Sequence, residues 1–187
     1  MANAMSAALH AALALHQAGA LDQAEAAYPR ILHTSPTHGD ALNLLGALLS
    51  QRGQHQAAIP LLQAAYEQLP HHLDAGLNLA KALPLAGRVH DALVALDTVL
   101  AAAPARIDAL VLRARCLRQL NRPDEACASL QQALTHAPNA PEVHLGLGGL
   151  LQTRMPEAAI HHYGVVLAHL PTHAGALNNL ALVHKAA

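Results

Sequence analysis

Residues 39–72, GDALNLLGALLSQRGQHQAAIPLLQAAYEQLPHH, set out a pattern that returns along the chain with a period of 34 residues. Prolines mark the end of each period: Pro36, Pro70, Pro104 and Pro138 are 34 residues apart, and Pro171 follows after 33. A fixed period in this range is typical of stacked structural repeats. We therefore expect one repeat domain over residues 1–187, with repeats 5–38, 39–72, 73–106, 107–140 and 141–173 and a partial repeat 174–187.

Small, large and turn-forming residues recur at fixed places within the period. Small residues occupy two positions: Ala12, Gly46, Ala80, Ala114, Gly148 and Ala181, then Ala24, Ala58, Ala92, Ala126 and Ala159. Large residues occupy a third position: Tyr28, Leu62, Leu96, Leu130 and Tyr163. Between them stand Gly19, Gly53, Gly87 and Asn121, residue types that tolerate a left-handed helix end. Because Ala and Leu dominate the apolar content, the pattern predicts pairs of closely packed antiparallel helices.

At this point the chain resembles the tetratricopeptide repeat family over nearly its whole length. The residues that carry the resemblance are Leu45, Gly46, Leu49, Gly53, Ala58, Leu62, Ala65 and Pro70, with Leu in place of the family's usual aromatic residues. The resemblance implies an all-α fold, a right-handed α-solenoid of five antiparallel helix hairpins plus a terminal helix. It also implies a concave groove lined by the first helix of each pair.

Three departures from the repeat pattern carry their own expectations. The turn of the fifth repeat, Gln152 to Pro156, is one residue short, which predicts a tighter turn. Pro29, Pro60 and Pro84 fall within helices and are predicted to bend or shorten them. The last repeat has only its first helix, with an apolar outer face, so we expect a fragment of a longer chain, a partner packed beyond residue 187, or self-association.

Composition and charge exclude several classes of protein. A formal net charge of −1 argues against nucleic-acid binding, which usually needs a basic stripe. No stretch approaches the roughly 20 apolar residues of a membrane span. The Ala- and Leu-rich start lacks the basic region of a secretion signal. Two cysteines, Cys116 and Cys127, are too few for a disulfide scaffold and are interpreted as free thiols inside one hairpin. These features predict a cytoplasmic protein.

The sequence contains no recognisable catalytic motif, so we expect neither an enzyme nor a cofactor. The glycine-rich stretch 146–149 falls within a predicted helix, which excludes a phosphate-binding loop. Histidines at the ends of repeats (His38, His71, His72 and His173) and in the fifth repeat (His161, His162 and His169) are interpreted as solvent-facing rather than metal-binding. Acidic residues at the second position of four repeats (Asp40, Asp74, Asp108 and Glu142) are interpreted as helix-capping groups.

The resemblance also singles out the side chains expected to face the groove. They are Asn43, Asn78, Lys81, Arg115, Arg118, Asn178 and Asn179, together with Lys185. Lys81 and Arg115 share one position in successive repeats and are predicted to lie one above the other. Asn78 and Asn179 resemble the asparagine ladder of the protein O-GlcNAc transferases, although His10, Leu44, Leu112 and Gly146 hold the same position elsewhere. Amides that pair with peptide groups, beside cations that attract carboxylates, suit a peptide ligand.

These observations predict a protein–protein interaction scaffold that binds a peptide or protein segment, with acidic or carboxylate groups, in the concave groove. The alternative is the N-terminal substrate-recognition arm of a larger bacterial transferase, a glycosyltransferase or sulfotransferase, whose catalytic domain is not contained in this sequence.

Overall fold

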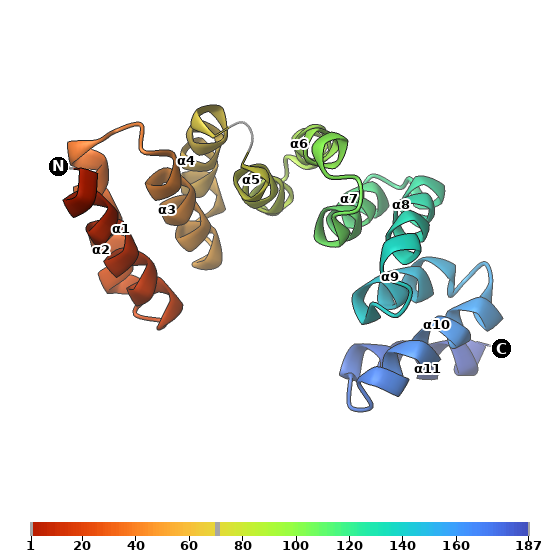
Figure 1. Cartoon of the computed structure of the whole chain (residues 1–187). Helices are drawn as coiled ribbons and strands as arrows, with labels where there is room; N and C mark the ends of the chain where they lie inside the picture. Colours follow the sequence, from red (N-terminus) through yellow and green to blue (C-terminus); the bar gives the residue numbers. More distant parts are fainter. Residues whose placement is uncertain (1, 70–71, 187) are drawn as a thin grey trace. The chain divides into compact units, whose positions relative to one another are not determined.

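The computed structural model describes residues 2–69 and 72–186, and within these ranges the regular structure is entirely α-helical (Figure 1). Pro70 and His71 lie outside the described residues. The helices are α1 (Ala2–Gln17), α2 (Leu21–Thr34), α3 (Gly39–Gln51), α4 (His55–Gln68), α5 (Leu73–Leu85), α6 (Val89–Ala102), α7 (Ile107–Gln119), α8 (Pro123–His136), α9 (Pro141–Leu151), α10 (Pro156–His169) and α11 (Ala174–Ala186). The all-α class is confirmed. From α3 onward, each first helix begins at a predicted repeat start.

The chain divides into two compact units, Met1–Val99 and Leu100–Ala187. Helices α1 to α5 and most of α6 belong to the first unit, and α7 to α11 belong to the second. In the first unit each helix from α1 to α5 packs on the next, and in the second unit each helix from α7 to α11 does the same. The continuity of one solenoid over residues 1–187, with its right-handed sense, stays a prediction.

The turns inside the first four hairpins use the left-handed backbone that their sequence predicts. Gly19, Gly53 and Gly87 have φ angles of 76°, 79° and 80°, and Asn121 has a φ of 56°. Glycine reaches this region without steric strain, and Asn is among the few other residues that tolerate it. Each turn therefore ends the first helix and starts the second within three residues.

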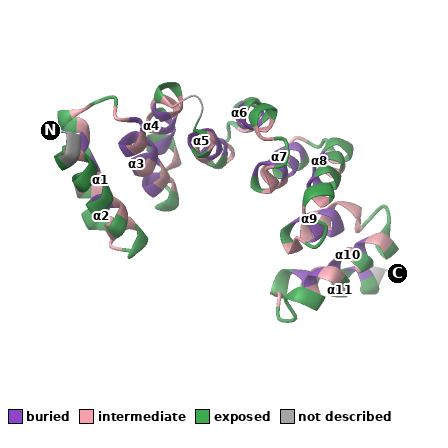
Figure 2. Ribbon diagram, viewed as in Figure 1, coloured by how far each residue is buried: buried purple, intermediate pink, exposed green. Residues whose placement is uncertain are grey.

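The small residues of the repeat allow the paired helices to touch. A Cβ atom placed on Gly46 would lie 2.6 Å from Cγ of Leu62, and one on Gly148 would lie 2.5 Å from Cε1 of Tyr163. Figure 2 shows the buried residues on the facing sides of the helices within each unit. The large residues at the third position are buried in every hairpin, which confirms their assignment as the core.

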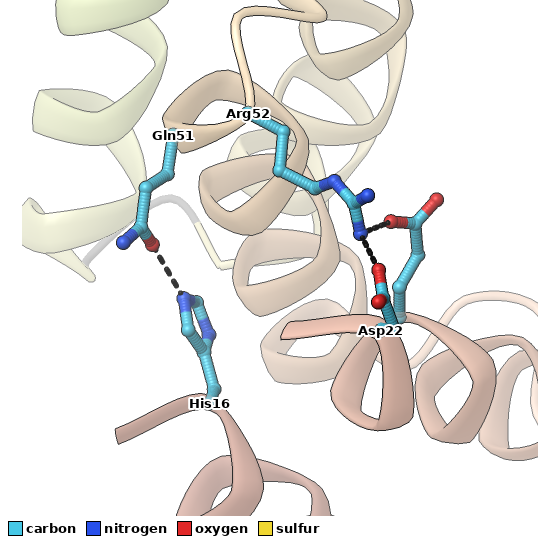
Figure 3. Close-up of polar contacts among 5 residues, drawn as sticks. His16, Asp22, Gln51 and Arg52 are labelled. Carbon is cyan, nitrogen blue, oxygen red and sulfur yellow. Dashed lines mark hydrogen bonds and ion pairs between the residues drawn. The ribbon is translucent and has the colours of Figure 1, made fainter. Parts of the chain in front are cut away.

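A polar cluster joins the first hairpin to the second (Figure 3). Nη1 of Arg52, in the turn after α3, lies 2.6 Å from Oδ1 of Asp22 and 2.8 Å from Oε2 of Glu25, both on α2. Nearby, Nε2 of His16 lies 3.0 Å from Oε1 of Gln51. Because these bonds connect residues about 30 positions apart, they hold one repeat against the next rather than stabilising a single helix.

Two expectations about departures from the pattern are wrong in part. Pro29 and Pro60 do not shorten their helices: α2 and α4 have 14 residues, as do α8 and α10. Both prolines are exposed, so their rings lie on the solvent side of the helix rather than against a neighbouring helix. Pro84 likewise leaves α5 with 13 residues, the length of α3.

The turn of the fifth repeat is not tighter. Helix α9 has 11 residues, two fewer than α7, and residues 152–155 form a turn one residue longer than the others. Without a glycine in the left-handed region, α9 ends in helical geometry at Gln152, which has φ −54° and ψ −30°. The shorter helix therefore absorbs the deletion.

Candidate functional site

A pocket of about 330 Å³ lies on the first-helix face of the second unit, between α7, α9 and α11. Its lining is mostly apolar, and it is partly open to solvent. The lining residues are Val111, Ala114, Arg115, Arg118, Leu130, Glu142, Leu145, Gly146, Gly149, Leu150, Gly175 and Asn179. Three of the side chains that the sequence placed in the groove, Arg115, Arg118 and Asn179, therefore meet at one cavity.

Helix α9 opens this pocket because it carries glycines where other first helices carry side chains. A Cβ on Gly146 would lie 2.8 Å from Cδ1 of Leu130, so this glycine lets Leu130 reach the cavity wall. A Cβ on Gly149 would approach only Nη1 of Arg118 at 3.8 Å and Oη of Tyr163 at 4.0 Å. The repeat register predicts this stretch to be part of a helix rather than a phosphate-binding loop. The stretch lies within α9, and of its three glycines only Gly149 leaves space uncrowded by neighbouring side chains.

The two arginines of the pocket are exposed and available to a ligand. In the part of the chain that the structure describes, neither Arg115 nor Arg118 forms an ion pair with a carboxylate. Glu142, at the start of α9, supplies a carboxylate on the same lining and also forms no ion pair with either of them. The site therefore presents two cations and one anion above an apolar floor.

Asn179 interacts with a buried tyrosine. Burial raises the pKa of the Tyr163 phenol, and a hydrogen bond with the Asn179 side chain opposes that rise. The Tyr163 hydroxyl donates to Oε1 of Gln152 at 3.2 Å. The neighbouring Asn178 is exposed and does not line the pocket.

The candidate residues of the first unit form a separate group. Nδ2 of Asn78 donates to Oδ1 of Asn43 at 3.0 Å, and Asn43 is only 6% exposed. Lys81 is exposed one helical turn further along α5. Because Lys81 belongs to the first unit and Arg115 to the second, their predicted juxtaposition stays a prediction, as does the asparagine ladder.

Two repeat-end histidines have a structural role that the sequence interpretation missed. Nδ1 of His38 accepts a hydrogen bond from the backbone N–H of Ala41 at 3.4 Å, and Nδ1 of His173 accepts one from Ala176 at 3.1 Å. Both therefore cap the start of a first helix. The acidic residues lie in the first turns of α3, α5, α7 and α9, where they complement the helix dipole. Asp108 also accepts a hydrogen bond from the backbone N–H of Ala109 at 2.9 Å, as expected of a capping group.

Two histidines, His144 on α9 and His162 on α10, contact each other inside the fifth hairpin. Nδ1 of His144 lies 2.9 Å from Nδ1 of His162, and Nε2 of His144 lies 2.8 Å from the carbonyl oxygen of Pro138. Since that carbonyl only accepts, His144 donates from Nε2 and accepts from His162 through Nδ1. Burial lowers the pKa of His162, and His144 and His161 lower it further. The interpretation of His162 as solvent-facing is wrong, because it is half-buried.

The described residues contain no assembled metal-binding site, and their two cysteine thiols are free. Among residues 2–69 and 72–186, no three His, Cys, Asp or Glu side chains are arranged to hold a metal ion. Cys116 is buried and Cys127 half-buried, and both are free thiols. Burial raises the pKa of both thiols, which keeps them protonated and unreactive at neutral pH. No helix of the described residues is long and apolar enough to span a bilayer.

Comparison with known proteins agrees with this architecture. The tetratricopeptide repeat family profile matches residues 49–116 and 85–148, together more than half of the chain. The chain therefore belongs to the tetratricopeptide repeat family. Proteins of this family are generally scaffolds for protein–protein interaction, and stacked repeats provide the extended binding surface that this requires.

Solved structures with the same fold cover almost the whole chain. A thermophilic TPR protein of Thermus thermophilus is 21% identical, with a TM-score of 0.75 over 97% of this chain and 99% of that one. PilF of Pseudomonas aeruginosa is 20% identical, with a TM-score of 0.85 over 98% and 84%. YrrB, described as a TPR protein with an unusual peptide-binding site, is 18% identical, with a TM-score of 0.74 over 91% and 89%. No curated protein matches the sequence.

Proposed function

We propose that the chain is a non-catalytic interaction module that binds a segment of another polypeptide on the first-helix face of its second unit. An acidic group of that segment lies against Arg115 and Arg118. The observation that carries the proposal is the pocket itself, which gathers two unpaired arginines and Asn179 around an apolar floor.

The chemistry of the lining favours a carboxylate-bearing peptide. A guanidinium group binds a carboxylate through two parallel hydrogen bonds, and it forms no competing internal ion pair here. Asn179 adds donors and an acceptor that match a peptide group. The described peptide-binding site of YrrB, on the same fold, supports peptide recognition as a use of this scaffold. The transferase-arm alternative receives no support from the three relatives named above.

The test is a selection of peptides from a random display library on the folded chain, followed by affinity measurements on the enriched peptides. We expect an excess of Asp and Glu among them. Arg115→Glu and Arg118→Glu should each weaken binding by about tenfold or more, because a like charge then faces the ligand carboxylate. The effect of each reversal should shrink at high salt.

Arg30→Glu provides a matched control, because Arg30 is an exposed arginine on α2 without an ion pair among the described residues. It makes the same charge change in the other unit and should leave affinity unchanged within about twofold. Enriched peptides without an acidic excess, or equal losses from Arg30→Glu and Arg118→Glu, would overturn the proposal.

A further inference from the structure

The pocket has a shape as well as a charge, and its shape depends on Gly149. Five helical glycines leave no free space, because neighbouring side chains fill the place of the missing Cβ. The nearest atom would lie 2.5–2.8 Å from that Cβ for Gly39, Gly46, Gly76, Gly146 and Gly148. Gly149 differs from them, since its nearest neighbour would be the Arg118 guanidinium at 3.8 Å, an ordinary contact distance. Packing therefore permits a side chain at Gly149.

A glycine inside a helix destabilises it by roughly 1 kcal/mol relative to alanine. At Gly149 no close helix contact offsets that loss, but the residue lines the pocket. A side chain at this position would project into the cavity, since Gly149 lines the pocket and the atom nearest to its Cβ would belong to Arg118, which lines the pocket too. Free space alone is not sufficient evidence, because Gly164 on α10 is also uncrowded; Gly164, however, lines no part of the pocket.

The size and lining of the cavity indicate what it accepts. About 330 Å³ is at the lower end of the range of roughly 300–1,000 Å³ for ligand sites. Leu130, Leu145 and Leu150 contribute apolar surface, which favours an apolar group. Arg118 lines the pocket next to Gly149, and a guanidinium plane stacks well on an aromatic ring. The same arginine, with Arg115, attracts a carboxylate beside that ring.

We infer that the pocket takes one aromatic side chain of the bound segment, flanked by an acidic residue, and that Gly149 is the residue that keeps the pocket wide enough for the ring. This inference rests on the proposed function and names the ligand of the same site. The aromatic ring lies on the leucine floor beneath Arg118, and the adjacent carboxylate binds Arg115 and Arg118. A bulky side chain at position 149 excludes the ring without touching the cations' charge.

The probes are three fluorescein-labelled nonapeptides, GSGEWEGSG, GSGELEGSG and GSGEAEGSG, titrated by fluorescence anisotropy. On the wild-type chain we expect the Trp peptide to bind about tenfold or more tightly than the Ala peptide, with the Leu peptide between them. The chain contains no Trp. In an unlabelled copy of the Trp peptide, the blue shift of emission therefore reports burial of that ring alone.

Gly149→Leu should reduce the affinity for the Trp peptide to that for the Ala peptide and abolish the blue shift. Gly164→Leu, the same substitution on an uncrowded and exposed glycine, should change neither. Gly149→Ala places a smaller side chain in the pocket than Gly149→Leu does. Thermal unfolding by circular dichroism confirms folding, and a lower melting temperature is not expected, since leucine and alanine both favour a helix over glycine.

The outcomes distinguish the aromatic pocket from the proposed binding of an acidic peptide. Equal binding of the three peptides, all weakened by Arg118→Glu, would overturn the aromatic pocket and leave the acidic-peptide function standing. Trp-selective binding that Gly149→Leu does not affect would also overturn the inference. Binding that Arg115→Glu and Arg118→Glu leave unchanged, or no binding of any of the three peptides at millimolar concentration, would count against the proposed function itself.

Discussion

Two neighbouring glycines of α9 should respond in opposite directions to the same substitution. Gly148→Ala and Gly149→Ala each gain about 1 kcal/mol of intrinsic helix stability. The new Cβ at Gly148 would lie 2.5 Å from Cε1 and 2.8 Å from Cζ of Tyr163, a fully buried ring. A rigid ring in a close-packed core cannot move without disturbing its neighbours, and such overpacking costs about 1–3 kcal/mol.

We therefore expect Gly148→Ala to be neutral or to destabilise the second unit by up to about 2 kcal/mol. Gly149→Ala should stabilise it by about 1 kcal/mol, because its Cβ makes only ordinary contacts at 3.8 and 4.0 Å. The expected gap between the two variants is about 1–3 kcal/mol. For a unit of this size, each kcal/mol shifts the melting temperature by about 4–8 °C.

Urea unfolding followed by circular dichroism, with the slope of the transition compared between variants, measures this gap. The adjacent positions share one helix and the same intrinsic preference, so each variant is the other's control. A Gly148→Ala variant as stable as Gly149→Ala would refute the reasoning, because it would mean that Tyr163 does not fill the space beside Gly148.

Three further perturbations test other parts of the structure. Arg52→Gln should lower the melting temperature more than Arg88→Gln, because Arg52 joins two repeats whereas Arg88 pairs with Asp91, three residues along the chain. In 1 M salt most of the difference in melting temperature should disappear. Asn121→Val should destabilise the folded chain by about 1–2 kcal/mol, because a β-branched residue is strained at a φ of 56°. Asn121→Gly should not destabilise it, and equal stabilities of the two variants in urea would contradict this reasoning. Burial lowers the pKa of His162, so the unfolded chain binds more protons than the folded one and stability should fall as pH drops below about 6.5. His162→Asn keeps a donor toward His144 but does not titrate, so its urea midpoint should depend less on pH; an unchanged dependence would exclude this role.

The local sequence was sufficient to predict the starts of the first helices from α3 onward and the first four turns. Helix starts at residues 39, 73, 107, 141 and 174 follow from the repeat period, and the left-handed turn residues follow from Gly53, Asn121 and their equivalents. These features depend on backbone preferences within a few residues, and the same preferences recur in every repeat. The expectation that prolines shorten their helices failed for Pro29 and Pro60, which are exposed to solvent. The expectation of a tighter fifth turn failed because α9 is shorter instead.

The candidate site was only partly predictable. Arg115, Arg118 and Asn179 were placed by family position, and the structure brings them to one pocket. The pocket itself could not be read from the sequence. Its volume depends on Leu130 reaching across from α8 and on the missing side chain at Gly149, and a glycine-rich run alone suggested other chemistry.

The sequence by itself determined that this chain is a series of helix hairpins with small residues at their contacts, because a period of 34 residues repeats the same local preferences until one architecture is specified. Only the tertiary structure decided which glycines are filled and which are open. The repeat assigns Gly148 to a small-residue position and makes no assignment for Gly149, but only the structure shows that the first faces the ring of Tyr163 and the second lines the pocket beside Arg118. One residue around a helix turns a side chain by about 100°, so their difference exists only once the neighbouring helices are in place.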